Sequence, residues 1–278
     1  MYEVEKKAFL DELKIFASTL RDRITREDKW TIRGFIDVFK NIYTISTDTK
    51  VVSKILELHI FPYCLEFAER IGYEIEPAKY QNWYPDLTFI NKENKSVKFA
   101  VDLKTTYKDE DYPEFCNGFT LGSHGEYFVN RVSTKNIQYP YGEYAGHFCL
   151  GIIYSRAMQE SKAETQKYSI DELDSIPAVI NNFIFFAEEK WKIASDKSGS
   201  GNTANIGSIQ KISDIISGNG VFAKAGEQIF DDYWANFNRM QIPMPNGEYK
   251  RLSSLSEFLD YKGLPQELNN PKASKRRN

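Results

Sequence analysis

The chain has 278 residues, of which 41% are hydrophobic and 14% aromatic, so it can bury a sizeable core in one large domain or in one domain with an appended subdomain. Its formal charge of −3 at pH 7 excludes the strongly basic balance typical of proteins that bind nucleic acids mainly through phosphates. Local binding of a polyanion stays possible, because the field inside one groove does not depend on net charge.

Neither an export signal nor a membrane span is predicted. No run of about 18 apolar residues occurs, and the N-terminal "MYEVEKKAFLDELK" alternates charged and apolar residues instead of forming an apolar signal core. The three cysteines, Cys64, Cys116 and Cys149, form no C-x-x-C pair, which argues against disulfides and cysteine-rich zinc sites. We therefore expect a soluble cytoplasmic protein.

Two helices are predicted in the first quarter of the chain. Residues 4–24 place apolar side chains at helical spacing. A second helix is expected from about Thr49 to Ile71, with Asp48 or Thr49 as its cap and Pro62 as a kink or break. The apolar positions of the first helix are Phe9, Leu10, Leu13, Phe16, Leu20 and Ile24.

A strand hairpin follows. In "SVKFAVDLK" apolar residues alternate with Lys98, Ala100, Asp102 and Lys104, which is the period of a strand with two distinct faces. Asp102 and Lys104 therefore point the same way. The segment "ENK" is the expected turn from the preceding strand "DLTFIN", so the hairpin brings Asp86, at the start of that strand, toward Asp102.

The second half of the chain completes a mixed α and β pattern. "HFCLGIIYSR" is typical of a buried strand, and "NNFIFFAEE" and "WKIA" are expected to add more sheet. "SDKSGSGNTANIGS" is expected to be a loop, followed by amphipathic helices at about 224–240 and 252–261. The histidines His59, His124 and His147 have no metal-binding spacing and are expected to be core or surface residues.

The hairpin carries the residue types of a metal-dependent hydrolase. Two convergent carboxylates, Asp86 and Asp102, can bind a hard divalent cation such as Mg²⁺. A lysine beside them, Lys104, can orient or deprotonate a water, or offset charge on a pentavalent phosphate. This is the apparatus of phosphodiester hydrolysis. The same pattern also occurs in solvated hairpins, and the pattern alone favours that interpretation. The predicted strands, whose alternation puts both acids on one face, strengthen the nuclease interpretation.

The glycine-rich stretch at 199–208 allows two interpretations from its residues. It lacks the lysine of a G-x-x-x-x-G-K-[ST] phosphate loop, whereas its composition suits a flexible linker.

Over about residues 40–222 the sequence resembles the EcoRV family of type II restriction endonucleases, within the PD-(D/E)XK nuclease superfamily. The resemblance implies an α/β fold with a central mixed sheet flanked by helices and a small dimerisation subdomain. It divides the chain into an N-terminal helical extension (1–30), an endonuclease domain (31–240) and a C-terminal helix with a basic tail (241–278). The matching runs are "TDTKVVSKILELHIFP", "GYEIEPAKYQNWYPDLTF", "VDLKTTY", "FTLG", "STKNIQYPYGEYAGH", "KYSIDELDSIP" and "GSGNTANIGS".

The resemblance also implies roles for single residues. Asp86 and Asp102 would be metal ligands and Lys104 the catalytic lysine, with Glu57 as a further acidic residue of the site, although by itself Glu57 is typical of an exposed helix glutamate. Gln81 and Asn82 match a loop that approaches the minor groove. Thr105, Thr106 and Lys135 match residues near the DNA backbone; ordinary polar residues of a strand or loop are an equally good interpretation.

The resemblance gives the glycine-rich stretch a third interpretation, as a recognition loop (198–208) that enters the major groove. Asn202 has an amide able to form a bidentate pair with adenine, and glycine lets the backbone approach the bases. Ala204 stands where the family has a second threonine, so a hydroxyl contact is lost. The residues assigned to this DNA contact are Gly199, Ser200, Gly201, Asn202 and Thr203.

The function implied is Mg²⁺-dependent hydrolysis of double-stranded DNA by a homodimer. Each subunit would read one half of a palindromic site and cut one strand, with dimer contacts near residues 33–45 and 166–178. A metal-activated water would attack phosphorus, leaving 5′-phosphates at a blunt cut in GATATC or a close relative, and a cognate DNA methyltransferase would accompany the enzyme. The alternatives are a structure-specific repair or junction nuclease and a catalytically inactive DNA-binding module.

Overall fold

A computed structural model describes residues 2–80, 82–157, 165–199, 204–243 and 247–271. Within these residues the main sheet has seven strands in the order β1-β2-β11-β9-β7-β6-β5. Strand β7 pairs β9 in parallel and β6 in antiparallel fashion. The strands of this sheet are β1 (Thr25–Arg26), β2 (Lys29–Trp30), β5 (Tyr73–Pro77), β6 (Leu87–Asn91), β7 (Lys98–Tyr107), β9 (Gly146–Arg156) and β11 (Ile180–Glu189).

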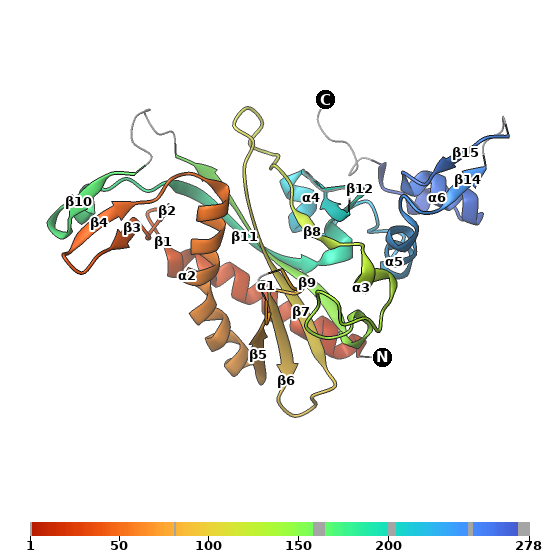
Figure 1. Ribbon diagram of the computed structural model, residues 1–278, viewed down its shortest axis with the longest axis horizontal. Coiled ribbons are helices and arrows are strands. Elements are labelled where there is room, and N and C mark those ends of the chain that lie inside the picture. The colour runs from red at the N-terminus through yellow and green to blue at the C-terminus, as the bar shows by residue number, and fades with distance from the viewer. Residues whose placement is uncertain (1, 81, 158–164, 200–203, 244–246, 272–278) are drawn as a thin grey trace.

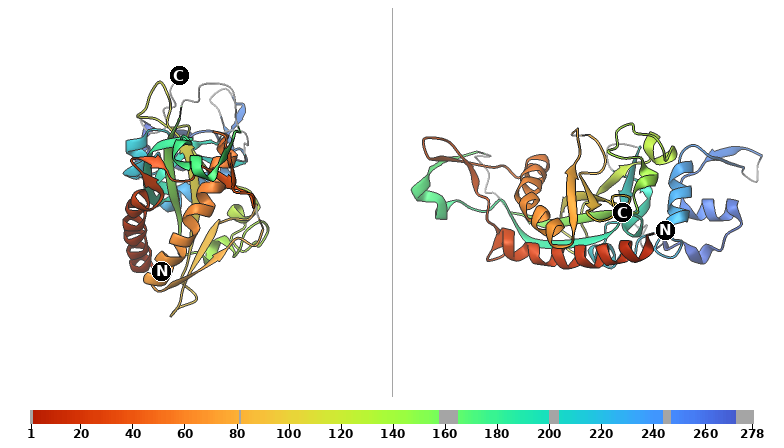
Figure 2. Two further views of the ribbon diagram at one scale, coloured as in Figure 1. Left: turned by 90° about the vertical axis from the view of Figure 1, so that its left-hand side faces the viewer. Right: turned by 90° about the horizontal axis from the view of Figure 1, so that it is seen from below.

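Two long helices cover one face of this sheet. Helix α1 (Glu3–Ile24) runs along β11, and α2 (Thr49–Arg70) lies against β5 and β7 (Figures 1 and 2). The predicted cap of α2 is confirmed, because Asp48 Oδ1 accepts hydrogen bonds from the backbone N–H groups of Lys50 and Val51 at 2.9 and 3.1 Å. Pro62 lies inside α2 and does not end it. Both helices are therefore continuous over nearly the predicted ranges.

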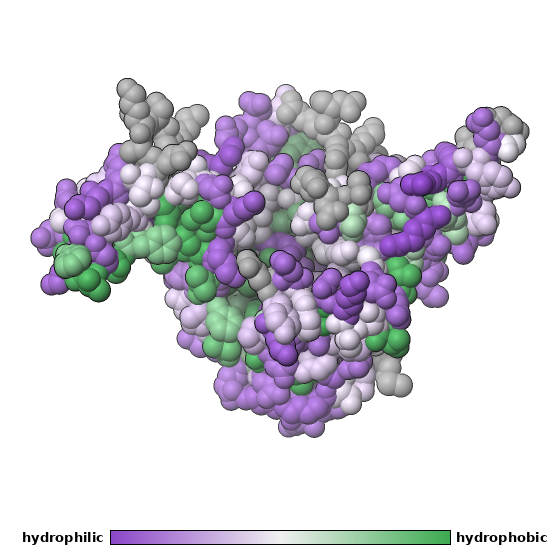
Figure 3. Space-filling view, in the orientation of Figure 1, coloured by the Kyte–Doolittle hydropathy of each residue, from purple (hydrophilic) through white to green (hydrophobic). Residues whose placement is uncertain are grey.

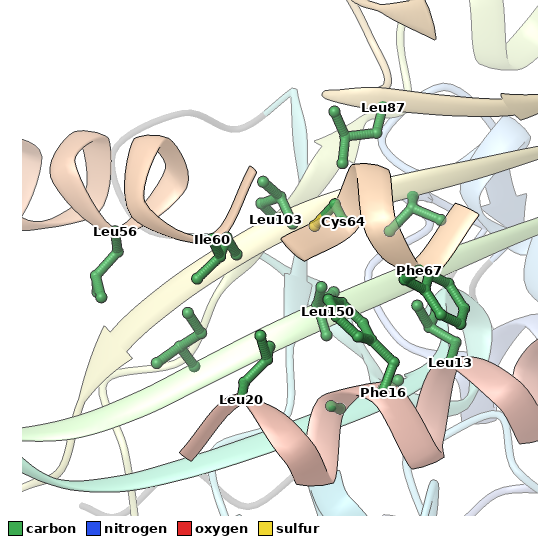
Figure 4. Packing of buried hydrophobic residues seen from close by; sticks show 14 of the residues in the cluster. Leu13, Phe16, Leu20, Leu56, Ile60, Cys64, Phe67, Leu87, Leu103 and Leu150 are labelled. Carbon is green, nitrogen blue, oxygen red and sulfur yellow. The ribbon is translucent and has the colours of Figure 1, made fainter. Parts of the chain in front are cut away.

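The first core lies between these helices and the sheet. Its aromatic centre includes Phe9, which stacks on Phe99 with ring centroids 4.4 Å apart, and Phe16, which stacks on Phe67 at 4.6 Å. Such burial is worth roughly 1.5–3 kcal/mol for each large apolar side chain. Figure 4 shows side chains of α1, α2 and the sheet pointing toward one another, among them Leu13, Phe16, Leu20, Leu56, Ile60, Cys64, Phe67, Leu87, Leu103 and Leu150.

A second core covers the opposite face of the sheet. Ala100, Cys149, Ile153 and Phe186 contribute to it from the sheet. The C-terminal elements α5 (Glu227–Asn236), β14 (Gln241–Pro243), β15 (Tyr249–Arg251) and α6 (Leu255–Lys262) lie at the right-hand end of Figure 1. The remaining elements are β8 (Thr120–Ser123), α3 (Glu126–Val129), η1 (Tyr141–Glu143), η3 (Lys190–Ile193), β12 (Ala194–Ser198), β13 (Asn205–Ser208), α4 (Ile212–Ile216) and η4 (Gln266–Leu268).

A separate three-stranded sheet, which we call the arm, projects at the left end of Figure 1. It has the order β10-β4-β3, so it joins the two ranges, 33–45 and 166–178, from which dimer contacts are expected. Tyr168 of β10 pairs Ile42 of β4. The elements of the arm are β3 (Gly34–Ile36), β4 (Asn41–Thr44), β10 (Lys167–Ser169) and the adjoining η2 (Ile170–Ser175).

Two predictions for the second half of the chain were wrong. "WKIA" is mostly a 3₁₀ helix, because Lys190 and Ile193 are buried at a spacing of three residues. The segment 195–208 is not simply a loop, since its two ends form β12 and β13, which pair with each other. The polar sequence hides these strands: Asp196 is buried, and its Oδ2 accepts the backbone N–H of Leu255 at 3.1 Å.

The helices expected at 224–240 and 252–261 are present as the shorter α5 and α6. No helix in the described segments is both long enough and apolar enough to cross a membrane.

Candidate active site

The predicted hairpin is confirmed, and it sets two carboxylates side by side. Leu87 of β6 pairs Val101 of β7, so Asp86, just ahead of β6, lies beside Asp102. The backbone N–H of Asp86 donates to Asp102 Oδ1 at 3.3 Å. In return, the backbone N–H of Leu103 donates to Asp86 Oδ2 at 2.8 Å. The two acids are thus held by the backbone of one hairpin.

Lys104 completes this group. Its Nζ lies 2.8 Å from Asp102 Oδ2 and 3.9 Å from Asp86 Oδ2. The strand period explains the contact, because residues 102 and 104 share one face of β7. The structure therefore brings together the three hairpin residues singled out from the sequence.

The solvated-hairpin interpretation is wrong for this strand. Val101 and Leu103 enter the first core and Ala100 enters the second, so β7 is covered on both faces. The side chain of Asp102 is only 11% exposed. A carboxylate this deep is costly unless cations or hydrogen-bond donors surround it, which makes an ordinary surface role unsuitable.

Burial and charge shift the protonation of the group. Burial raises the pKa of Asp86 to about 7, and the charges of Asp102 and Glu57 add to the rise, against Lys104 and the Leu103 N–H. Burial disfavours the charged form of Lys104, but the negative charges of Asp102 and Asp86 favour it more strongly, so the pKa of Lys104 is raised. Asp86 keeps 36% of its side chain exposed. The metal-free site thus holds more negative charge than Lys104 alone offsets, and it is open to a further cation.

The oxygen donors fit a hard divalent cation. Carboxylate oxygens are the ligands that Mg²⁺ prefers, and this ion usually takes only one or two carboxylates and keeps several waters. Within the described residues, no three His, Cys, Asp or Glu side chains gather into a larger ligand set. Asp86 and Asp102 would hold such an ion and leave positions for water and a phosphate oxygen.

A cleft of about 1020 Å³ opens beside Asp86. Helix α2 forms one wall, where Glu57 pairs with Lys54 at 2.8 Å. Asn82 and Thr105 also line this cleft. An adjoining cavity of about 310 Å³ is lined by Lys104 and Thr106. Glu57, Thr105 and Asp86 border both spaces, which together can take an extended ligand along β7.

The other residues assigned from the sequence fall into two groups. Lys135 is exposed in a turn and lines neither of these two cavities, and Gly199 follows β12. Gln81, Ser200, Gly201, Asn202 and Thr203 lie outside the described residues.

The ends of the predicted recognition loop are joined to the cavity wall. The backbone N–H of Gly199 donates to the Asn205 carbonyl at 2.9 Å, and Gly207 of β13 pairs Thr120 of β8. Thr120 also lines the smaller cavity beside Lys104. Sequence reasoning missed Thr120, because "FTLG" had no chemical signal of its own and only strand pairing brings it to the site.

The fold and the site define a nuclease of the restriction-endonuclease class, with two acids and a lysine on adjacent strands of a mixed sheet. The comparisons with known proteins agree. The family model described as restriction endonuclease EcoRV matches residues 26–263, beyond both ends of the similarity noted in the sequence. The type II restriction enzyme EcoRV from Escherichia coli is 37% identical over 236 residues, covering 84% of this chain and 93% of that relative.

The chain therefore belongs to the EcoRV family of type II restriction endonucleases. It is a deoxyribonuclease, and its family implies the restriction-endonuclease fold, DNA binding and a metal-dependent reaction.

Proposed function

We propose that the protein cuts both strands of a palindromic DNA site in a Mg²⁺-dependent reaction, leaving blunt ends with 5′-phosphates. The observation that carries this proposal is the contact among Asp86, Asp102 and Lys104 beside a cleft. GATATC or a close relative is the proposed site, from the similarity to the EcoRV family. A flexible TA step at its centre would favour the bending that a central cut requires.

The chain's own residues supply the rest of the chemistry. Asp86 and Asp102 would hold Mg²⁺, which when bound supplies Lewis-acid polarisation of the phosphate and lowers the pKa of water. Lys104 would orient the attacking water or offset the charge that develops on the phosphate. Hydrolysis forms a bond between the water oxygen and phosphorus and breaks the bond to O3′. Glu57 is assigned to the same site because its charge acts on Asp86.

The proposed DNA contacts are of two kinds: some position the DNA backbone, and others read the base sequence. Thr105, Thr106 and Lys135 are assigned to the DNA backbone. Gln81 and Asn82 are assigned to the minor-groove side, and the segment Gly199–Thr203 to the bases in the major groove. Asn82, Thr105 and Thr106 support this assignment by lining the two cavities.

A homodimer is part of the proposal, because one active site cuts one strand and a palindrome needs two related sites. The arm supports it. Its apolar side chains are exposed, and Figure 3 shows apolar surface at this end of the molecule. Exposed apolar patches of this kind mark interaction surfaces. The residues concerned are Phe35, Ile36, Val38, Phe39, Ile170 and Leu173. A cognate methyltransferase is proposed as the partner that protects the host site.

The test is digestion of a plasmid that contains single GATATC and related sites, with and without Mg²⁺, followed by sequencing of the ends. We expect discrete linear products with blunt 5′-phosphorylated ends. Asp102→Ala, which removes a proposed ligand without a neighbour to replace it, should abolish cleavage and retain or strengthen metal-free DNA binding. Nicking of branched DNA without site-specific bands would favour a structure-specific nuclease instead, and binding without cleavage an inactive module.

A further inference from the structure

Lys190 is a buried cation that the proposed reaction does not use. It follows directly after β11, and only 3% of it is exposed. Its neighbours along the chain do not neutralise it. Glu188 pairs with Lys14 at 2.7 Å, and Glu189 pairs with Lys6 at 2.7 Å and Lys192 at 2.6 Å. A buried lysine whose adjacent carboxylates are paired elsewhere is costly to retain.

Aromatic rings surround the ammonium group. Nζ of Lys190 lies 4.8 Å from the ring centroid of Tyr84, 5.5 Å from Phe128 and 5.4 Å from Tyr141. No hydrogen-bond acceptor for Nζ occurs among the described residues. Ring faces attract a cation without accepting its protons, so the cage fixes the position of the charge and leaves its field unneutralised.

Strand register places this cage close to the candidate active site, because Glu189 of β11 pairs Phe148 of β9, which in turn pairs Val101 of β7. Tyr84 precedes Asp86 by two residues, and its hydroxyl is 2.9 Å from His147 Nδ1. A Cβ at Gly122 of β8 would lie 3.4 Å from Lys190 Nζ. Burial lowers the pKa of Lys190 to about 8, and among the charges that oppose this fall Asp102 is the strongest, ahead of Asp231. Asp231 already has a partner, Arg131, at 2.9 Å.

We propose that Lys190 is a positioning residue whose fixed charge balances Asp102 from the core side and so limits how tightly the site binds a divalent cation. When both acids are ionised and both lysines are protonated, Asp86 and Asp102 carry two negative charges, which Lys104 and Lys190 together balance. A divalent cation entering from the cleft therefore meets a repulsive field from behind. This inference rests on the proposed metal site at Asp86 and Asp102.

The experiment measures binding of Mn²⁺ to the DNA-free protein, with free Mn²⁺ followed by electron paramagnetic resonance. Lys190→Met keeps the length and apolar stem of the side chain and removes its charge. We expect Mn²⁺ to bind at least about fivefold more tightly, because the charge of Lys190 repels a divalent ion at Asp102 measurably even with water-like screening. The melting temperature should stay the same or rise, because a buried charge is lost. Lys190→Arg, which retains the charge, should bind Mn²⁺ as the parent does.

Lys192→Met is the matched control. It removes a lysine two residues away that pairs with Glu189, and it should leave Mn²⁺ affinity within about twofold of the parent. An unchanged or weakened affinity in Lys190→Met would overturn the inference. If Lys190→Met does not fold, Lys190→Gln takes its place, and failure of both to fold assigns the lysine to the fold and also overturns the inference.

Asp102→Asn separates this inference from the proposed function. Loss of Mn²⁺ binding in Asp102→Asn together with an unchanged affinity in Lys190→Met rejects only the role of Lys190. Parental binding in Asp102→Asn rejects the metal site itself, and the inference with it.

Discussion

The backbone N–H of Leu103 donates a hydrogen bond to Oδ2 of Asp86 across 2.8 Å. Leu103 lies between Asp102 and Lys104, so one residue of β7 holds the acid of the preceding strand while its two neighbours point into the site. The strand backbone thus sets the distance between both carboxylates and the lysine. This arrangement needs no loop to close before the charged groups are in place.

Lys104→Ala should remove catalysis and keep the fold. The ammonium group lies between two carboxylates and is the cation nearest to them, so single-turnover cleavage at saturating Mg²⁺ should fall at least about a hundredfold. Lys98→Ala is the control: Lys98 lies on the same face of β7 but pairs with Glu143 at 3.4 Å. It should leave cleavage intact and cost roughly 1 kcal/mol of stability or less, the usual range for loss of one such ion pair. Lost stability with retained chemistry in Lys104→Ala would make that lysine structural.

Asp86→Asn should stabilise the metal-free protein at pH 8. The pKa of Asp86 is raised from 3.8 to about 7 in the folded protein, so the folded state binds this proton more tightly than the unfolded state does. The stabilisation that this bound proton gives the folded state is complete below about pH 4 and is lost as the pH rises through 7. The melting temperature of Asp86→Asn should therefore exceed that of the parent at pH 8, and the difference should shrink toward pH 5. Asp22→Asn, an exposed change on α1, should show no such trend. A parent more stable than Asp86→Asn at pH 8 would contradict the prediction.

Gly199→Ala tests whether close packing against Thr120 positions the start of the recognition loop. A Cβ at this position would lie 2.8 Å from Cγ2 of Thr120, so β8 or the segment must shift, at a cost of roughly 1–3 kcal/mol. Cleavage of the cognate site should slow by about tenfold or more. Thr120→Ser removes the clashing methyl group, and the double variant Gly199→Ala/Thr120→Ser should recover most of the rate. If the double variant stays as slow as Gly199→Ala, the contact with Thr120 does not position the recognition loop.

Asn202→Ala tests base reading. If its amide pairs with a base, the change should cost roughly 1 to 3 kcal/mol of discrimination at one position of each half-site. Binding to random DNA should change little, because an amide releases no counterions. Cleavage of the cognate site is compared with cleavage of single-substitution sites at one salt concentration. If parent and variant cut the cognate site equally fast and reject altered sites equally well, the glycine-rich stretch is a linker.

Phe39→Glu tests the arm as a dimer contact. Phe39 is 81% exposed, so the folded subunit should tolerate the glutamate, whereas an apolar interface should not. Light scattering after size exclusion should show dimers for the parent and monomers for Phe39→Glu, with loss of double-strand cleavage. Ile15→Glu changes an exposed apolar residue of α1 and should leave the dimer intact. If Phe39→Glu forms dimers as stable as those of the parent, the arm is not the dimer contact.

The sequence alone determined the elements whose signals are local. The helical spacing of Leu13, Phe16 and Leu20 predicts α1, which the structure has from Glu3 to Ile24. Alternation in "SVKFAVDLK" predicts the strand and puts Asp102 and Lys104 on one face. A short turn makes the preceding strand its neighbour, so the contact with Asp86 follows as well. These features depend on residues a few positions apart, where the backbone geometry itself fixes which side chains meet.

Only the tertiary structure decided what surrounds that hairpin. The polar-looking face of β7 is buried because a second core, built from segments as near as Cys116 and as distant as Phe258, closes over it. Pairing of β8 with β13 brings Thr120 to the cavity, and packing turns Lys190, the residue before "WKIA", into the aromatic cage. Such contacts are set by how whole layers pack against each other, and no periodicity in a short window records which distant layer will cover a given side chain.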